Sequence, residues 1–227
     1  MTSNPNELTI ENSALVLIDH QPGVALAVQS IDQGLLLNNV AALAGAAKAL
    51  GVPTVLSTIG AQGSVLVDPI FKEISAIFPD ITPIDRTTTH AWSDPKFRAA
   101  VDATGRKNLI MAGIVTGTCL SQSVLAALKD RFEVYFVSDC SGDVTKEAHD
   151  DAKVVMRQAG ARPITWLNLT GQWVPDYRSP ERAALASNYS QRGGGVGLMT
   201  DYVIDQVAAS VVPAPDFLSA PVPAQAS

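Results

Sequence analysis

The sequence SALVLID, residues 13–19, decides the fold class of this chain. Apolar residues follow Ser13 without interruption until Asp19. A strand with one face in water alternates polar and apolar residues, whereas a strand covered on both faces does not. The segment therefore predicts a buried strand inside a parallel sheet.

Strands of this kind alternate with helical segments along the rest of the chain. We expect further strands at residues 54–58, 81–85, 109–112, 134–138 and 163–167. Helices are predicted between them, at residues 35–50, 68–78, 118–129 and 145–159, and from Pro95 onward. The repeated strand-then-helix order predicts an α/β fold with an open, mainly parallel, Rossmann-like sheet of about six strands.

The pattern weakens beyond residue 170. We expect a flexible loop at 191–197, QRGGGVG, and a terminal helix at 200–209. The last residues are rich in proline and alanine. The sequence thus predicts one domain over residues 1–209 and a C-terminal tail over 210–227.

Composition excludes several classes of protein. The 227 residues carry 16 basic and 22 acidic side chains, a net charge of −6, and no Lys/Arg cluster, which argues against a nucleic-acid partner. Apolar stretches are interrupted well before about 18 residues, which argues against a membrane span. The N-terminus lacks the pattern of a signal peptide, and two cysteines cannot build a disulfide scaffold, so we expect a cytoplasmic protein.

Ligands of open parallel sheets bind beyond the carboxyl ends of the strands. Three polar clusters are predicted there: Asp19-His20-Gln21, Asp85-Arg86, and the segment from Gly113 to Cys119. We expect these clusters to converge on one crevice, with His20, Gln21, His90, Trp92 and Thr116 lining the pocket.

Cys119 lies where a Gly/Thr-rich loop enters a helix. Free N–H groups at a helix start favour a thiolate and can hold an oxyanion, so Cys119 is a candidate nucleophile. The alternative is a small buried apolar residue. Cys140 follows a strand without such a helix entry, and we interpret it as a packing residue.

The two charged candidates each have two interpretations. Asp19 is either the group that takes the thiol proton or a turn cap. Arg86 either orders Asp19 and favours a nearby thiolate or is a surface charge. The helix start, Arg86 and the loop N–H groups favour a Cys119 thiolate, whereas the negative charge of Asp19 disfavours it. A proton shared between Asp19 and Cys119 would resolve this conflict, and the titration would then belong to the pair.

The three histidines show no metal-binding spacing. We expect His149 on a solvated helix face. The sequence predicts neither a metal site nor a cofactor.

Four segments resemble the isochorismatase-like cysteine hydrolase superfamily, in its YcaC-like branch. They are ALVLIDHQPG (14–23), IDRTTTHAWSDPKF (84–97), NLIMAGIVTGTCLS (108–121) and FVSDCSGDVT (136–145). The resemblance covers about residues 10–205. It implies a three-layer α/β/α fold and a homo-oligomer built from dimers, with a tetramer or an octamer as its options.

The resemblance also assigns roles in a catalytic triad. Cys119 matches the family nucleophile and Asp19 the base, while Arg86 falls on the family lysine position. A cis peptide is implied between Ile114 and Val115, with the N–H groups of Val115 and Cys119 as an oxyanion hole.

The implied activity is hydrolysis of a small-molecule amide through a thioester. Two alternatives remain open: a small-molecule esterase with the same cysteine, and a catalytically weak binding or assembly protein on the same scaffold. Nicotinamidase relatives hold a metal on Asp and His ligands, and this sequence shows no matching cluster.

Overall fold

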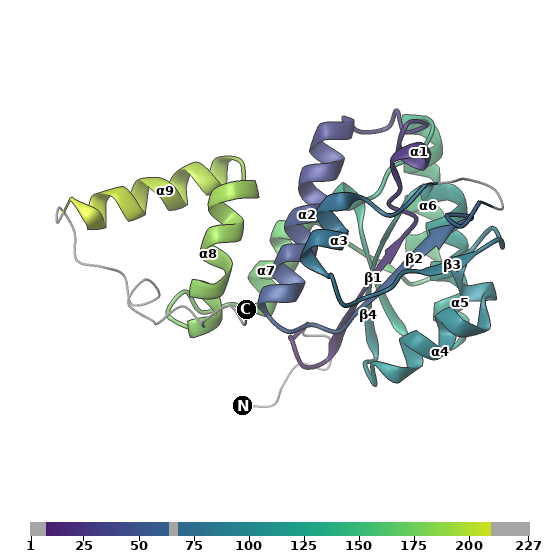
Figure 1. The fold of residues 1–227 in the computed structure, drawn as a ribbon. Helices are drawn as coiled ribbons and strands as arrows, with labels where there is room; N and C mark the ends of the chain where they lie inside the picture. Colours follow the sequence, from purple (N-terminus) through teal and green to yellow (C-terminus); the bar gives the residue numbers. More distant parts are fainter. Residues whose placement is uncertain (1–7, 64–67, 210–227) are drawn as a thin grey trace.

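The computed structural model describes residues 8–63 and 68–209. Six strands form one parallel sheet in the order β3-β2-β1-β4-β5-β6. They are β1 (Ser13–Ile18), β2 (Thr54–Ile59), β3 (Ile84–Arg86), β4 (Asn108–Gly113), β5 (Glu133–Val137) and β6 (Arg162–Ile164). The predicted α/β class and parallel sheet are therefore confirmed (Figure 1).

Strand β1 lies in the middle of the sheet: β2 and β3 follow on one side of it, and β4, β5 and β6 follow on the other. Ile18, the last residue of β1, is in register with Ser57 on one side and with Gly113 on the other. The segments that leave β1 and β4 therefore separate at the same edge of the sheet, where open α/β sheets form their ligand crevice.

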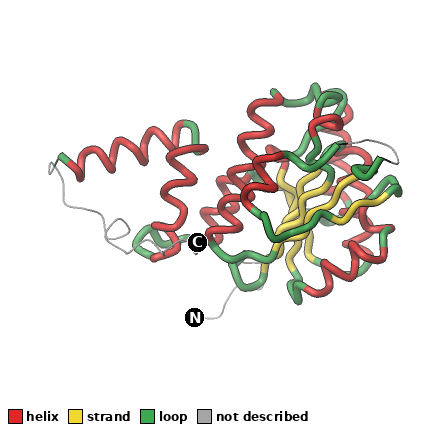
Figure 2. Tube along the Cα trace, in the orientation of Figure 1, coloured by secondary structure: helices red, strands yellow, loops and turns green. Residues whose placement is uncertain are grey.

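Helices cover both faces of the sheet, which makes three layers (Figure 2). One face carries α1 (Pro22–Ala25), α2 (Gln33–Ala49), α3 (Lys72–Ile77) and α7 (Trp166–Trp173). The other face carries α4 (Pro95–Ala103), α5 (Ser121–Lys129) and α6 (Lys146–Gln158). Strand β1 contributes to both cores: Leu15 and Leu17 point into the first, and Val16 and Ile18 into the second. This two-sided burial explains why residues 13–18 show no polar alternation.

Local capping sets several helix boundaries. The Asp32 side chain accepts a hydrogen bond from Leu35 N at 2.8 Å and so begins α2. Gly51 follows the helix with a φ of +68°, a left-handed conformation that glycine adopts without strain. Asp94 caps α4 in the same way as Asp32, and Pro95 occupies the first turn, as predicted.

Some predicted boundaries were wrong. The strand expected at 81–85 is Ile84–Arg86, because Pro83 has no N–H to offer a ladder. The strand expected at 163–167 is Arg162–Ile164, because Thr165 caps α7 instead. The helix expected at 68–78 is shorter, Lys72–Ile77.

The glycine-rich segment at 191–197 is not a loop over its whole length. Helix α8 (Pro180–Arg192) and helix α9 (Gly195–Ala208) leave only Gly193 and Gly194 between them. A Cβ atom on Gly193 would lie 2.5 Å from the Tyr189 carbonyl oxygen, so a tight helix–helix turn requires glycine there. The terminal helix expected at 200–209 accordingly begins earlier.

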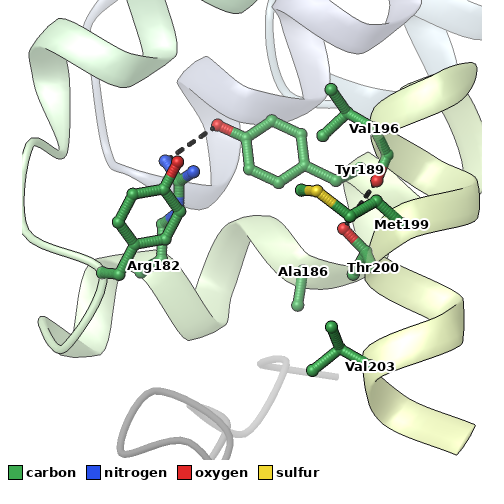
Figure 3. A pocket seen from close by; sticks show the side chains of 8 residues that line it. Arg182, Ala186, Tyr189, Val196, Met199, Thr200 and Val203 are labelled. Atoms are coloured by element: carbon green, nitrogen blue, oxygen red, sulfur yellow. Dashed lines mark hydrogen bonds between the residues drawn. The ribbon is translucent and has the colours of Figure 1, made fainter.

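Helices α8 and α9 project from the α/β body, and α9 runs crosswise to α8 (Figure 1). Helix α8 packs on α2, where Asn188 Nδ2 donates to Ala42 O at 3.0 Å. A cavity of about 270 Å³ lies between α8 and α9, with the Arg182 guanidinium against the Tyr189 ring (Figure 3). The tail predicted at 210–227 lies outside the described residues.

Candidate active site

A buried ion pair lies at the carboxyl edge of the sheet. Arg86 Nη1 lies 2.6 Å from Asp19 Oδ1, and Arg86 Nη2 lies 2.7 Å from Asp19 Oδ2. Arg86 also donates to Ser57 Oγ and to the Thr58 carbonyl, each at 3.0 Å. Both charged side chains are fully buried, so this guanidinium is not a surface charge, and it fixes the orientation of the carboxylate.

Asp19 reaches this position through an unusual backbone conformation. Its φ is +58°, in the left-handed region that aspartate tolerates better than most residues. Its N–H donates to Ser57 O at 2.9 Å, so the chain leaves the sheet directly after this bond. The conformation turns the carboxylate away from the strand direction and into the crevice.

Residues Thr116–Leu120 form a five-residue π-helical turn between β4 and α5, which we call the Cys119 turn. Leu120 N donates to Val115 O at 3.3 Å, and donor and acceptor are five residues apart, as in a π helix. The helix predicted at 118–129 therefore begins only at Ser121, and Cys119 lies in the turn that precedes it.

Three groups surround the half-buried Cys119 thiol. The Asp19 carboxylate and the Val115 backbone N–H lie near enough to the thiol to shift its pKa, and Thr118 Oγ1 lies 3.7 Å from the sulfur. The peptide bond between Ile114 and Val115 is cis. The structure thus brings Asp19, Arg86, Val115 and Cys119 together at one point.

Burial and charge act together on the Asp19–Cys119 pair. Burial raises the pKa of Cys119, and the negative charge of Asp19 raises it further, although the Val115 N–H acts in the opposite direction. Burial also raises the pKa of Asp19, against the lowering effect of Arg86. The thiol is therefore protonated at neutral pH, beside a carboxylate with increased proton affinity.

Four of the five predicted pocket-lining residues are buried instead. His20, Gln21 and Thr116 have no exposed surface. The indole N–H of Trp92 donates to Asp130 Oδ2 at 2.8 Å, and Asp130 follows the end of α5 farthest from Cys119. Only His90 of these five is partly exposed, and the positive charge of Arg86 adds to burial in lowering its pKa.

Each of the buried polar side chains has an internal partner. Gln21 Oε1 accepts from Ile59 N at 2.7 Å, and its Nε2 donates to Asp68 O at 2.7 Å. His20 Nε2 lies 2.9 Å from Cys140 O. These hydrogen bonds connect the loops at the carboxyl edge of the sheet to one another.

Two residues near the site were not identified from the sequence. Asp143 accepts a hydrogen bond from Gly117 N at 2.6 Å, but it lies six residues after the end of β5, so the strand-end rule does not point to it directly. His149 was predicted to be solvated, which is wrong: its ring is buried, with Nδ1 2.9 Å from Thr116 Oγ1. A single buried position on an otherwise polar helix turn leaves no clear periodic signal.

Residues 8–63 and 68–209 contain neither a metal-binding cluster nor a membrane-spanning helix. No group of three or more His, Cys, Asp or Glu side chains lies close enough together there to hold a metal ion. No helix in that part of the chain is both long and apolar enough to cross a bilayer.

The cavity between α8 and α9 is lined by none of the strand-end residues described above. We place the candidate site at the Asp19–Cys119 crevice because acid–base and nucleophilic groups meet there, whereas the cavity lining is mostly apolar.

The fold and this site define an α/β protein with a thiol–carboxylate pair at the switch point of its sheet. The chain belongs to the isochorismatase family, because the Isochorismatase domain model matches residues 13–167. It is 35% identical over 192 residues to the probable hydrolase YcaC of Escherichia coli, covering 83% of this chain and 91% of that protein.

Solved structures show the same relationship. The crystal structure of Escherichia coli YcaC, described as an octameric hydrolase of unknown specificity, matches with a TM-score of 0.81 over 88% of this chain and 98% of that chain. YcaC from Pseudomonas aeruginosa, solved with hexane-2,5-diol and covalent acrylamide, is 29% identical and matches with a TM-score of 0.82 over 88% of this chain and 98% of that chain.

Proposed function

We propose that this chain is a cysteine hydrolase that cleaves the C–N bond of a small-molecule amide through a thioester. The observation that carries the proposal is the contact of the Cys119 thiol with both the Asp19 carboxylate and the Val115 N–H. A nucleophile, a base and an oxyanion donor are the parts that acyl transfer requires.

The first half-reaction forms the thioester. Asp19 accepts the proton of the Cys119 thiol as the sulfur attacks the amide carbonyl carbon. The N–H groups of Val115 and Cys119 donate to the oxyanion of the tetrahedral intermediate. When the C–N bond breaks, Asp19 gives its proton to the leaving nitrogen, and ammonia or an amine departs.

The second half-reaction releases the acid. Asp19 takes a proton from a water molecule that attacks the thioester carbonyl, and the same N–H groups hold the second oxyanion. The C–S bond then breaks, the proton returns to the sulfur, and the carboxylic acid product departs. The raised pKa of Asp19 suits this cycle, since a base with an ordinary aspartate pKa would take up a thiol proton less readily.

Arg86 has a separate role in this proposal. A guanidinium does not release a proton at neutral pH, so Arg86 cannot serve as the acid. Its two N–H groups contact both oxygens of Asp19 and hold the carboxylate in the plane from which it reaches Cys119.

The test is a panel of small amides and matched esters, with ammonia or amine release and acid release both measured. Turnover of amides that is lost in Cys119→Ser and kept in Cys140→Ser supports the proposal. Turnover of esters alone favours the esterase alternative, because both substrates pass through the same acyl-enzyme. No turnover and no covalent adduct at Cys119 favours a binding or assembly protein.

We also infer that the chain forms a homo-oligomer. The octameric state of the Escherichia coli relative supports this, since that structure covers 88% of the chain. Helix α9 exposes a group of large apolar side chains, Leu198, Met199 and Tyr202, which are 74%, 55% and 64% exposed in the isolated chain. Exposed apolar patches of this kind mark protein–protein contacts.

A further inference from the structure

The Cys119 turn is held by a buried carboxylate from another part of the chain. Gly117, in the middle of the turn, donates its N–H to Asp143 Oδ2 at 2.6 Å. Asp143 is 2% exposed. Gly117 lies two residues after Val115 and two before Cys119, the residues that supply the oxyanion donors, so this bond acts on both of them.

Asp143 is itself rigidly placed. Its second oxygen, Oδ1, accepts from Val144 N at 2.7 Å, and its own N–H donates to Ser30 Oγ at 2.8 Å. Its carbonyl oxygen accepts from Gln29 N at 2.9 Å. In the part of the chain that the structure describes, no Lys or Arg forms a salt bridge with this carboxylate. Its oxygens are therefore occupied by backbone N–H groups.

The hydrogen bonds that Val115 O accepts from the turn are long. Thr118 N and Leu120 N both donate to Val115 O, at 3.2 and 3.3 Å. By contrast, the bonds that reach the turn from the segment after β5 are short: Gly117 to Asp143, and Thr116 N to Gly142 O at 2.9 Å. The short external bonds, rather than the weak internal ones, set the position of the turn.

The contact leaves no free space at Gly117. A Cβ atom added there would lie 3.1 Å from Asp143 Oδ2, closer than ordinary van der Waals contact. Glycine at this position lets the carboxylate approach the backbone directly.

We propose that Asp143 is a positioning residue, whose buried carboxylate clamps the Gly117 N–H and thereby aims the Val115 N–H and the Cys119 sulfur at one point. The assignment rests on the proposed function, because it concerns the alignment of the nucleophile with its oxyanion donor. Asp143 itself does not touch the Cys119 sulfur and takes no proton in the reaction.

The experiment compares Asp143→Asn with Asp139→Asn. Asparagine keeps the size of Asp143, but it presents an NH₂ group to one of two backbone N–H donors. Asp139 is the matched control, because its Oδ1 accepts from the backbone N–H of Trp166 at 3.1 Å, away from the Cys119 turn. Two quantities are measured: kcat and KM on the best substrate, and the rate of iodoacetamide labelling of Cys119 against pH.

For Asp143→Asn we expect kcat to fall about 100-fold, with KM changed by less than about threefold, because a small misplacement of reacting groups acts on the transition state. The labelling rate at pH 7.5 falls about tenfold, because the thiolate loses a hydrogen bond from Val115 N–H. Asp139→Asn leaves both quantities near their wild-type values. Wild-type labelling by a folded Asp143→Asn protein, or an equal effect of Asp139→Asn, overturns the proposal.

A second variant tests the same contact from the other side. Gly117→Ala places a methyl group against Asp143 and is expected to lower kcat and labelling as Asp143→Asn does. In the double variant Gly117→Ala/Asp143→Ala the added methyl group meets no carboxylate, so its effect is smaller than the sum of the effects of the single variants Gly117→Ala and Asp143→Ala. Additive effects contradict the clamp. The labelling measurements need no substrate, so they decide on Asp143 even if no amide is hydrolysed.

Discussion

Arg86 and Asp19 form a bidentate ion pair that is fully buried, with nitrogen–oxygen distances of 2.6 and 2.7 Å. Removing two charges from water is unfavourable, and only close geometry with additional hydrogen bonds compensates for it. Arg86 has such bonds, to Ser57 Oγ and to the Thr58 carbonyl. Arg86 therefore orients the Asp19 carboxylate, and each of the two buried charges needs the other as its counter-charge.

Removal of Arg86 alone should destabilise the protein. Arg86→Met leaves the Asp19 carboxylate buried without a counter-charge, and we expect the free energy of unfolding to fall by about 3–5 kcal/mol, measured by urea denaturation. Arg98→Met is the control, because the Arg98–Asp130 pair is 50% and 38% exposed and should contribute less than about 1 kcal/mol. Equal losses of unfolding free energy in the two variants would show that the buried Asp19–Arg86 pair contributes no more to stability than an exposed pair does.

The two cysteines should differ in reactivity. Cys119 is half-buried in the crevice, whereas Cys140 is fully buried, and burial together with Asp139 raises the pKa of Cys140 well above its ordinary value. Iodoacetamide should therefore label Cys119 first, as read from intact mass and peptide mapping. Labelling of Cys140 before Cys119 would show that Cys119 is wrongly assigned as the nucleophile.

Cys119→Ser should abolish turnover with the fold retained. A hydroxyl has a far higher pKa than a thiol, so Asp19 cannot deprotonate it efficiently, and we expect kcat to fall more than about 10³-fold. Circular dichroism provides the control for folding. Activity near that of the wild type would exclude Cys119 as the nucleophile.

Asp19→Asn separates thiolate formation from proton transfer. Asparagine tolerates the φ of +58° at this position, and it removes the negative charge that raises the pKa of Cys119. The midpoint of Cys119 labelling should therefore move to lower pH, while hydrolysis falls about 10²–10⁴-fold because no base remains. Faster labelling together with retained hydrolysis would mean that Asp19 affects the pKa of Cys119 but is not the base.

His20 should make stability dependent on pH. Burial lowers the pKa of His20 from 6.5 to about 4, so between these pH values His20 is protonated in the unfolded chain and neutral in the folded protein. Its contribution to stability is present above pH 6.5 and is lost as the pH falls toward 4. Between pH 7 and pH 5 we expect a loss of about 2 kcal/mol in unfolding free energy, which is absent in His20→Asn.

His90→Asn is the matched control for that measurement. His90 is partly exposed, and its pKa is also lowered, by burial and by Arg86, so its removal should change the pH dependence in the same direction but less. If His20→Asn leaves the slope between pH 7 and pH 5 unchanged, then His20 is not held neutral by its environment.

The exposed face of α9 should mediate association. Tyr202→Asp places a charge among the apolar side chains of this face, and we expect a lower mass by light scattering at micromolar concentration than for the wild type. Val154→Asp is the control, because Val154 is 48% exposed on α6, in the α/β body rather than on the projecting helices α8 and α9. A wild-type protein that is monomeric under these conditions would contradict the homo-oligomer.

The sequence alone was sufficient for the sheet and for the residues at its edge. The uninterrupted apolar run ending at Ile18 follows from burial on both faces, and Asp19 and Cys119 follow from the rule that ligands bind beyond strand ends. These signals are local in the chain, so they can be recognised without knowledge of long-range contacts.

Only the tertiary structure decided how those residues are paired and charged. The structure selects between the two interpretations of Arg86, because this side chain contacts Asp19 across 67 positions of the chain. Trp92 contacts Asp130, and Asp143 contacts Gly117 from the segment after β5, pairings that no local pattern indicates. The protonation of Cys119 depends on how deeply its neighbours bury it, which no local pattern encodes. Side-chain partners and desolvation are set by packing between elements distant in sequence, and for that reason the chemistry of this site, unlike its location, could not be predicted from the sequence.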